Sequence, residues 1–181
     1  MPSRHLLILA AAAWPALALA QPKGAAHPAA HAPSPPSSAE PKLIGKFDDW
    51  RAVTYQEGGQ LVCYAFVRAS NSQPALPGRG DVVLTVTQRN GGRDAVAISA
   101  GFPYAADSEV QMAVDQAQLP FYTAGRSAFA RDGRATAAAF VKAREAVAKS
   151  PGPRNAAVTD TFSLRGFSPA YAAINKACPA K

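Results

Sequence analysis

Polar and apolar residues alternate along most of the chain after residue 47, and turn signals recur at short spacing. This pattern predicts an antiparallel β-rich domain. The first alternating segment, 48–56, ends at a Glu-Gly-Gly turn and is followed by 61–69, which is apolar on both faces. We expect the two segments to form a hairpin whose second strand is central in the sheet. Segment 71–80 holds too much proline and glycine to continue a sheet and is expected to be a surface loop.

A clear strand is predicted over 81–89, where side chains alternate between two faces. Val82, Leu84 and Val86 would point inward, whereas Thr85 and Thr87 would point outward. An Asn-Gly-Gly turn closes a hairpin with the next strand. The remaining strands are predicted at 94–102, 109–114, 119–123, 127–131 and 157–164.

Two helices are also expected. Segment 134–149 has apolar residues at helical spacing, which predicts an amphipathic helix. A terminal helix is predicted with Ser168 as its N-cap and Pro169 at its first position. The fold class is therefore mainly β (α+β), an antiparallel β-sandwich-like domain with two peripheral helices.

The N-terminal part has the composition of an export signal and a tether. Residues 1–20 combine a basic start, an apolar run and an Ala-Leu-Ala end, which is typical of a secretory signal peptide. Residues 21–42 are rich in Pro, Ala and Ser and predict a disordered tether, so the folded domain is expected at 43–181. A weak metal site through His27 and His31 is the alternative for this tether. The mature chain would be periplasmic or secreted, with no transmembrane segment after signal cleavage.

The absence of histidine after residue 42 limits the chemistry of the folded part. All three histidines of the 181-residue chain precede the predicted domain. Ser-His-Asp and Cys-His catalysis and His-ligated zinc are therefore unavailable to the domain. We expect no cofactor and no metal.

The only two cysteines, Cys63 and Cys178, both lie in the predicted exported domain. An even pair in an oxidising compartment most often forms a disulfide. A bridge would join the second predicted strand to the last helix, and two free buried thiols are the alternative.

Three acidic residues are candidates for a site. Asp160 lies inside a strand-like run, where it would either serve as a ligand-binding or catalytic carboxylate, or play a structural role by pairing with Arg165 or accepting backbone N–H bonds at a strand end. Asp107 and Glu109 would share one strand face, as a glycosidase or a Ca²⁺ site requires. Two acids on a solvated strand face are the more common arrangement.

Net charge favours anionic partners. The chain carries a formal charge of +7, which becomes +6 when Arg4 is removed with the signal peptide, and long-range attraction would draw it to lipopolysaccharide, anionic lipid or glycosaminoglycan. Nucleic acid is not expected, because export separates the two and no nucleic-acid-binding motif is present. A positive surface that serves only solubility is the alternative. The candidate anion-binding residues are Arg79, Arg89, Arg93, Arg126 and Arg131.

Three segments together resemble the invasion-associated locus B family of Gram-negative bacteria. They are GKFDDWRAVTYQEGGQLVCYAF at 45–66, AISAGFPYAADSEVQMAVD at 97–115 and VTDTFSLRGFSPAYAAINKAC at 158–178. The resemblance covers residues 43–178. It implies a secreted or periplasmic β-rich domain, linked in some pathogens to host-cell invasion, with no established enzymatic activity.

Three functions are consistent with these observations. The leading hypothesis is a non-enzymatic exported envelope protein that binds a surface or a partner. The second is a carboxylate-dependent hydrolase that uses Asp107, Glu109 or Asp160, which requires paired carboxyl groups in one cleft. The third is a periplasmic assembly factor, which requires an unpaired apolar sheet edge.

Overall fold

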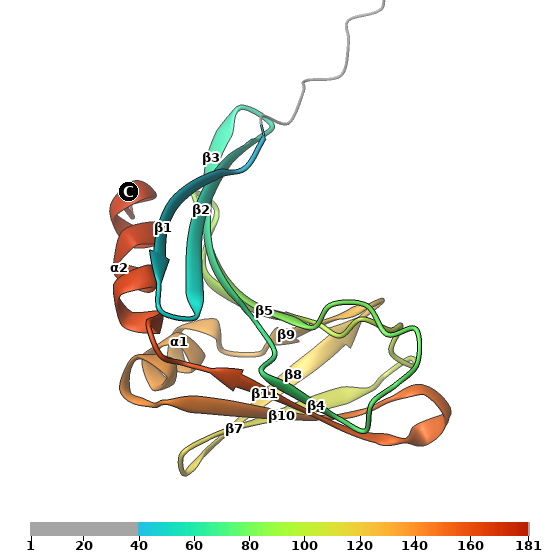
Figure 1. Cartoon of the computed structure of the whole chain (residues 1–181). Coiled ribbons are helices and arrows are strands. Elements are labelled where there is room, and N and C mark those ends of the chain that lie inside the picture. Colours follow the sequence, from blue (N-terminus) through green and yellow to red (C-terminus); the bar gives the residue numbers. More distant parts are fainter. Residues whose placement is uncertain (1–39, 181) are drawn as a thin grey trace, which may run out of the picture. The chain divides into compact units, whose positions relative to one another are not determined.

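The computed structural model describes residues 40–180, which form one antiparallel sheet and two α-helices (Figure 1). This confirms the mainly β fold class with two helices. The helices are α1 (Gly133–Lys142) and α2 (Phe167–Ala177), and a single 3₁₀ turn, η1, spans Pro153–Asn155. The strands are β1 (Lys42–Phe47), β2 (Trp50–Glu57), β3 (Gln60–Arg68), β4 (Asn71–Gln73), β5 (Val83–Arg89), β6 (Gly92–Ser99), β7 (Glu109–Val114), β8 (Ala117–Ala124), β9 (Ser127–Ala130), β10 (Glu145–Pro151) and β11 (Ala157–Ser163).

The sheet curls back on itself, which produces two facing layers. Its strand order is β1-β2-β3-β5-β6-β9-β8-β7-β10-β11-β4. Strand β4 follows β3 directly in the chain yet pairs with β11 at the far end of this order. The backbone N–H of Ser70, between β3 and β4, donates to the carbonyl oxygen of Thr161 at 2.8 Å. Figure 1 shows the resulting bend, with β10, β11 and β4 lying across from β5 and β9.

The hydrophobic core lies on the inner face of the curled sheet and beneath the helices. Helix α2 packs on β1, β2 and β3, and α1 packs on β6 and β9. Both helices therefore cover one end of the core. The largest fully buried apolar side chains are Trp50, Phe121, Phe140, Phe162, Phe167, Leu84, Ile98, Met112 and Ile174.

The alternation predicted for 81–89 is confirmed. Val82, Leu84 and Val86 are buried, whereas Thr85 and Thr87 are only half-buried on the opposite face. We call the face that carries these threonines the outer face. It continues across β2, β3, β5, β6, β9 and β8, and neither helix packs on it.

The helix predicted over 134–149 is wrong in its second half. Helix α1 ends at Lys142, Ala143 adopts an extended conformation, and β10 begins at Glu145. This strand pairs with β7 on one side and β11 on the other, and its buried Ala146 and Ala148 alternate with more exposed residues. Alanine is the strongest helix former, but intrinsic propensity is a small effect, and strand pairing on both edges overrides it here.

Besides β10, two more strands differ from the prediction. Strand β1 begins at Lys42, inside the expected tether, and pairs with β2 through a bulge near Gly45. Strand β4 lies inside the expected loop 71–80, where Asn71 and Gln73 pair with β11. Both strands are short and rich in polar or glycine residues, so neither shows the alternation that identifies a strand.

The terminal helix starts slightly earlier than predicted. Gly166, not Ser168, is its N-cap and adopts a left-handed conformation with φ of 84°. A Cβ atom at this position would collide with the carbonyl oxygen of Phe47. The Ser168 hydroxyl instead donates to the carbonyl oxygen of Val141 at 3.1 Å, which ties α2 to the end of α1.

The predicted disulfide is confirmed. Cys63 of β3 and Cys178 after α2 are bonded, their Cα atoms lie 5.9 Å apart, and 115 positions separate them in the chain. Cys63 is fully buried on the inner face, where α2 packs. The bond therefore fixes the last helix to the centre of the sheet.

Replacing Asp132 by alanine is expected to lower the free energy of unfolding by about 1 kcal/mol. Its carboxylate caps α1 by accepting from the backbone N–H of Ala135 at 2.9 Å. Urea unfolding of the two proteins measures the change. Asp132→Ser keeps a capping oxygen and should lose much less, and equal losses from both variants would contradict the capping role.

Some predictions fall on residues that the structure does not describe. The signal peptide, most of the tether, and His27 and His31 lie before residue 40. Within residues 40–180, no helix has both the length and the apolar character needed to cross a membrane. In the same residues, no group of three or more acidic, Cys or His side chains is placed to hold a metal ion.

Candidate functional site

The most buried charged group of the fold is a pair formed by Arg79 and Asp160. Asp160 points inward from β11, and Arg79 reaches it from the loop between β4 and β5. Two guanidinium nitrogens donate to the two carboxylate oxygens at 2.8 and 2.7 Å. The side chains are only 7% and 2% exposed, so the pair is shielded from solvent.

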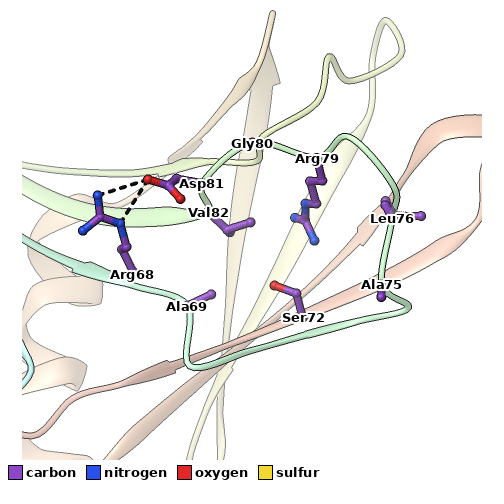
Figure 2. Close-up of a pocket in the computed structure, with 9 residues that line it drawn as sticks. All are labelled: Arg68, Ala69, Ser72, Ala75, Leu76, Arg79, Gly80, Asp81 and Val82. Atoms are coloured by element: carbon purple, nitrogen blue, oxygen red, sulfur yellow. Dashed lines mark hydrogen bonds and ion pairs between the residues drawn. The ribbon is translucent and has the colours of Figure 1, made fainter.

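Further polar groups complete this pair. The Ser72 hydroxyl donates to Asp160 at 2.7 Å, and Nε of Arg79 donates to the carbonyl oxygen of Ala100 at 2.8 Å. Figure 2 shows Arg79 pointing from its loop toward Ser72 of β4. The guanidinium also lies over the Phe102 ring, 4.9 Å from its centroid. Each guanidinium nitrogen of Arg79 and each carboxylate oxygen of Asp160 thus has a hydrogen-bond partner, which is typical of a structural anchor for the loop.

Tyr104 lies at the edge of this cluster. Burial raises the pKa of its hydroxyl above the ordinary value, and the negative charge of Asp160 adds to the shift. The pKa shift therefore keeps Tyr104 neutral and does not prepare it as a base.

Two hollows flank the loop that carries Arg79. One, of about 320 Å³, is lined by residues that include Arg68, Ser72 and Asp81 (Figure 2). The other, of about 190 Å³, lies between the loop and Phe102. Because the Arg79 guanidinium is already bound to Asp160, neither hollow offers a free buried charge to a ligand.

Arg165 is not the partner of Asp160. It is exposed after β11, and its backbone N–H donates to the Ser163 hydroxyl at 3.2 Å. Asp160 does form a structural ion pair, but its partner is Arg79 and not Arg165. The sequence places Arg79 in a segment without strand-like alternation, which predicts an exposed side chain. The structure buries it instead.

The three acids of the hydrolase hypothesis do not share a cleft. Asp160 faces the inner side of the sheet. Glu109 alternates with buried Val110 and Met112, so it lies on the outer face, where it pairs with Arg131 at 2.5 Å. Asp107 is exposed in the turn before β7. The geometry gives no pair of facing carboxyl groups, so it offers no support for this hypothesis.

The five candidate anion-binding arginines all make contacts within the fold. Arg79, Arg89 and Arg131 pair with Asp160, Glu57 and Glu109. Arg93 donates to Asn175 and to the carbonyl oxygen of Cys178, at the C-terminal end of α2, and Arg126 donates to the carbonyl oxygen of Gly101.

In the pair of Arg89 and Glu57, the carboxyl group is ionised at neutral pH. Hydrogen bonds from Arg89, and then from Tyr55, hold the pKa of Glu57 below its ordinary value. The carboxylate therefore offsets the charge of its arginine across the neutral pH range. Together these contacts leave no concentrated patch made from the five arginines.

On the outer face, two pairs of aromatic side chains lie on either side of a row of small side chains, and we call this arrangement the outer-face trough. One wall is formed by Tyr64 and Phe66 of β3, whose ring centroids lie 5.9 Å apart. The other is formed by Phe129 of β9 and Tyr122 of β8, which stack at 5.5 Å. The floor between them consists of the small side chains Thr85, Thr87, Ala95 and Ala97.

Strand register places these residues in one row. Phe66 pairs with Thr85, Thr85 with Ala97, and Ala97 with Phe129. Three strand spacings of about 4.8 Å separate the two walls by roughly 14 Å. A hollow of about 290 Å³, lined by Pro41, Tyr55, Tyr64 and Thr87, opens beside the first wall.

Sequence reasoning did not identify the trough. A signal for it in the sequence is that 61–69 is apolar on both faces, a pattern that also predicts a central strand. The second apolar face is not needed for the core, because Tyr64 and Phe66 stay half-exposed. Recognising the opposite wall required knowing that β9 and β8 follow β6 in the sheet, which is a long-range feature.

The edge strand required by the assembly-factor hypothesis is present but interrupted. Strand β1 ends the sheet, and its Leu43 and Ile44 are 48% and 37% exposed. The bulge near Gly45 and the charged Lys42 and Lys46 break this edge. Bulges and edge lysines are devices that discourage strand addition.

The curled antiparallel sheet and the buried disulfide define a mainly β, disulfide-bonded domain. A family model described as invasion associated locus B (IalB) protein matches residues 50–175. The chain belongs to this family, as its sequence segments predict.

A solved structure is similar to the chain in fold. The crystal structure of invasion associated protein B from Bartonella henselae aligns with a TM-score of 0.54 and 17% sequence identity. The alignment covers 74% of this chain and 95% of that one. At this identity the likeness concerns the fold alone. No curated protein matches the chain.

Proposed function

We propose that this chain is a non-catalytic exported protein of the bacterial envelope, periplasmic or secreted, that binds a surface or partner through the outer face of its sheet. One observation carries the proposal. Tyr122, Phe129, Tyr64 and Phe66 are left partly exposed on a face that no helix covers. Tyrosine and arginine are enriched at binding surfaces, and this face is rich in both.

The partner is proposed to be anionic overall, with lipopolysaccharide, anionic lipid and host glycosaminoglycan as candidates. Without Arg4 of the signal peptide, the mature chain carries a formal charge of +6, which favours encounter with a negative surface. The names of the matching family and structure refer to invasion, so a host-cell surface belongs among the surfaces to test.

The mature chain is expected to bind vesicles that contain purified lipopolysaccharide. Binding should weaken as salt rises, because exposed charges are screened over about 8 Å at physiological ionic strength. Tyr122→Ser should weaken it by about fivefold, since a contact aromatic is worth on the order of 1 kcal/mol. Co-sedimentation with vesicles measures both effects.

A matched control shortens an equally exposed apolar side chain outside the outer face. Val141 is 44% exposed on α1, as Tyr122 is on β8, so Val141→Ala should leave binding unchanged. If the chain binds no such vesicle, heparin or anionic phospholipid at low salt, the proposed function is wrong. If Val141→Ala weakens binding as much as Tyr122→Ser, the outer face is not the binding surface.

A further inference from the structure

The rim of the outer-face trough is nearly neutral although it is rich in charged groups. Three ion pairs surround the trough: Arg89 with Glu57, Arg68 with Asp81, and Arg131 with Glu109. Arg51 and its neighbour Lys46 lie on the same face, and neither forms an ion pair with any residue between 40 and 180. The rim thus carries about two net positive charges, which is too little for the trough alone to hold a densely charged polyanion.

A peptide strand cannot form backbone hydrogen bonds with the strands at the centre of the trough floor. Strand β5 pairs with β3 and β6, and β6 pairs with β5 and β9. The backbone groups of β5, and those of β6 from Ala97 to Ser99, are therefore used inside the sheet, and strand addition requires an open edge. A ligand can be held here only by side chains.

A second copy of the chain is also a poor occupant. From Phe66 to Tyr122 the trough crosses four strand spacings, or roughly 19 Å, and it extends about four residues, or roughly 13 Å, along each strand. This projected area of about 250 Å² is far below the roughly 800 Å² per partner that a stable interface buries. A narrow, extended ligand fits these dimensions better.

The side chains of the trough suit sugar rings. A pyranose presents C–H groups on its faces and hydroxyl groups around its edge. Aromatic faces carry partial negative charge, which attracts such C–H groups. The Thr87 hydroxyl on the floor and the guanidinium and carboxylate groups of the rim can exchange hydrogen bonds with the sugar hydroxyls. The hollow beside Tyr64, at about 290 Å³, is close to the lower end of ligand pockets, about 300 Å³.

We propose that the outer-face trough binds a strand of an uncharged or sparsely charged polysaccharide, with sugar rings stacked on the walls formed by Tyr64, Phe66, Phe129 and Tyr122. This inference rests on the proposed function and names the ligand of the same face. The positive charge of the whole chain brings it to an anionic surface, and the trough makes the short-range contact with the glycan.

The test titrates the mature chain with three probes and follows the methyl NMR signals of Thr85, Thr87, Ala95 and Ala97. The probes are a neutral glucose hexasaccharide, the lipid-free polysaccharide released from lipopolysaccharide, and a heparin hexasaccharide. We expect one or both of the first two to shift these signals. Their affinity should change less than about twofold between low and physiological salt, because little charge is neutralised.

Variants separate the trough from other surfaces. Tyr122→Ser and Thr87→Val should each weaken binding severalfold, and the double variant Tyr64→Ala/Phe129→Ala by about tenfold or more. Thr87→Val keeps the β-branched shape, so it tests the hydroxyl in a folded protein. Val141→Ala on α1 should bind as the wild type does.

Several results would overturn the proposal. Binding of the heparin hexasaccharide alone, or binding that Tyr122→Ser and Thr87→Val leave unchanged, would show that the trough does not hold a neutral glycan. If removal of residues 21–40 alone moves the floor signals and makes glycan binding appear, the Pro-rich segment of this chain occupies the trough. Vesicle binding without any polysaccharide binding would refute this inference and leave the proposed function standing.

Discussion

Replacing both Cys63 and Cys178 by alanine is expected to lower the free energy of unfolding by about 4–5 kcal/mol. The bond closes a loop of 115 positions, and loops of about 100 residues give about 4.7 kcal/mol in the chain-entropy model. Small exported domains often depend on such bonds at physiological temperature. The double variant should therefore be marginally stable or unfolded at 37 °C.

Guanidinium unfolding, followed by circular dichroism, measures this loss. The wild type in excess reductant is the matched control, because it breaks the same bond without changing a side chain. The two should unfold at similar denaturant concentrations. A loss below about 1 kcal/mol in both would contradict a stabilising role for the bond.

Replacing Asp160 by asparagine is expected to cost about 3–5 kcal/mol, because it leaves the Arg79 guanidinium buried without a counter-charge. Both side chains are more than nine-tenths buried, so water cannot replace the lost partner. Denaturant unfolding measures this loss. Asp107→Asn, which removes an exposed acid, is the control and should change stability by no more than about 0.5 kcal/mol.

A double replacement tests whether the loss comes from leaving one charge unpaired or from changing the side chain at position 160. Arg79→Met/Asp160→Leu removes both charges and should recover most of the stability, as apolar replacements of buried ion pairs often do. If Asp160→Asn costs no more than Asp107→Asn, the pair does not anchor the loop. If Asp160→Asn leaves the fold intact but removes binding to lipopolysaccharide vesicles, Asp160 belongs to the binding site.

Sequence reasoning succeeded where local pattern and covalent chemistry decide the structure. Alternation in 81–89 gave the correct buried face, and the compartment implied by the signal-like N-terminus gave the correct disulfide. It failed at 134–149, where alanine-rich sequence is compatible with helix and strand. There the neighbours β7 and β11, which are distant in sequence, select the strand.

The polar contacts were the hardest part to predict, because they join residues far apart in the chain. The Asp94 carboxylate accepts from the buried Gln88 amide at 2.6 Å and from the Tyr171 hydroxyl at 2.5 Å. Burial, and then this hydrogen bond, raise the pKa of Tyr171. Eighty-one positions likewise separate Arg79 from Asp160. A count of charged residues predicts that side chains such as Arg79, Asp94 and Asp160 lie at the surface. In the fold they form hydrogen bonds in the interior or between elements.

Hydroxyl-radical footprinting of the mature chain bound to lipopolysaccharide vesicles tests the central claim most directly. Binding through the outer face predicts that Tyr122, Phe129, Tyr64 and Phe66 become protected, while exposed side chains on α1, such as Val141, keep their reactivity. Protection confined to the helices or to the loop that carries Arg79, with the four aromatic residues still reactive, would contradict the claim.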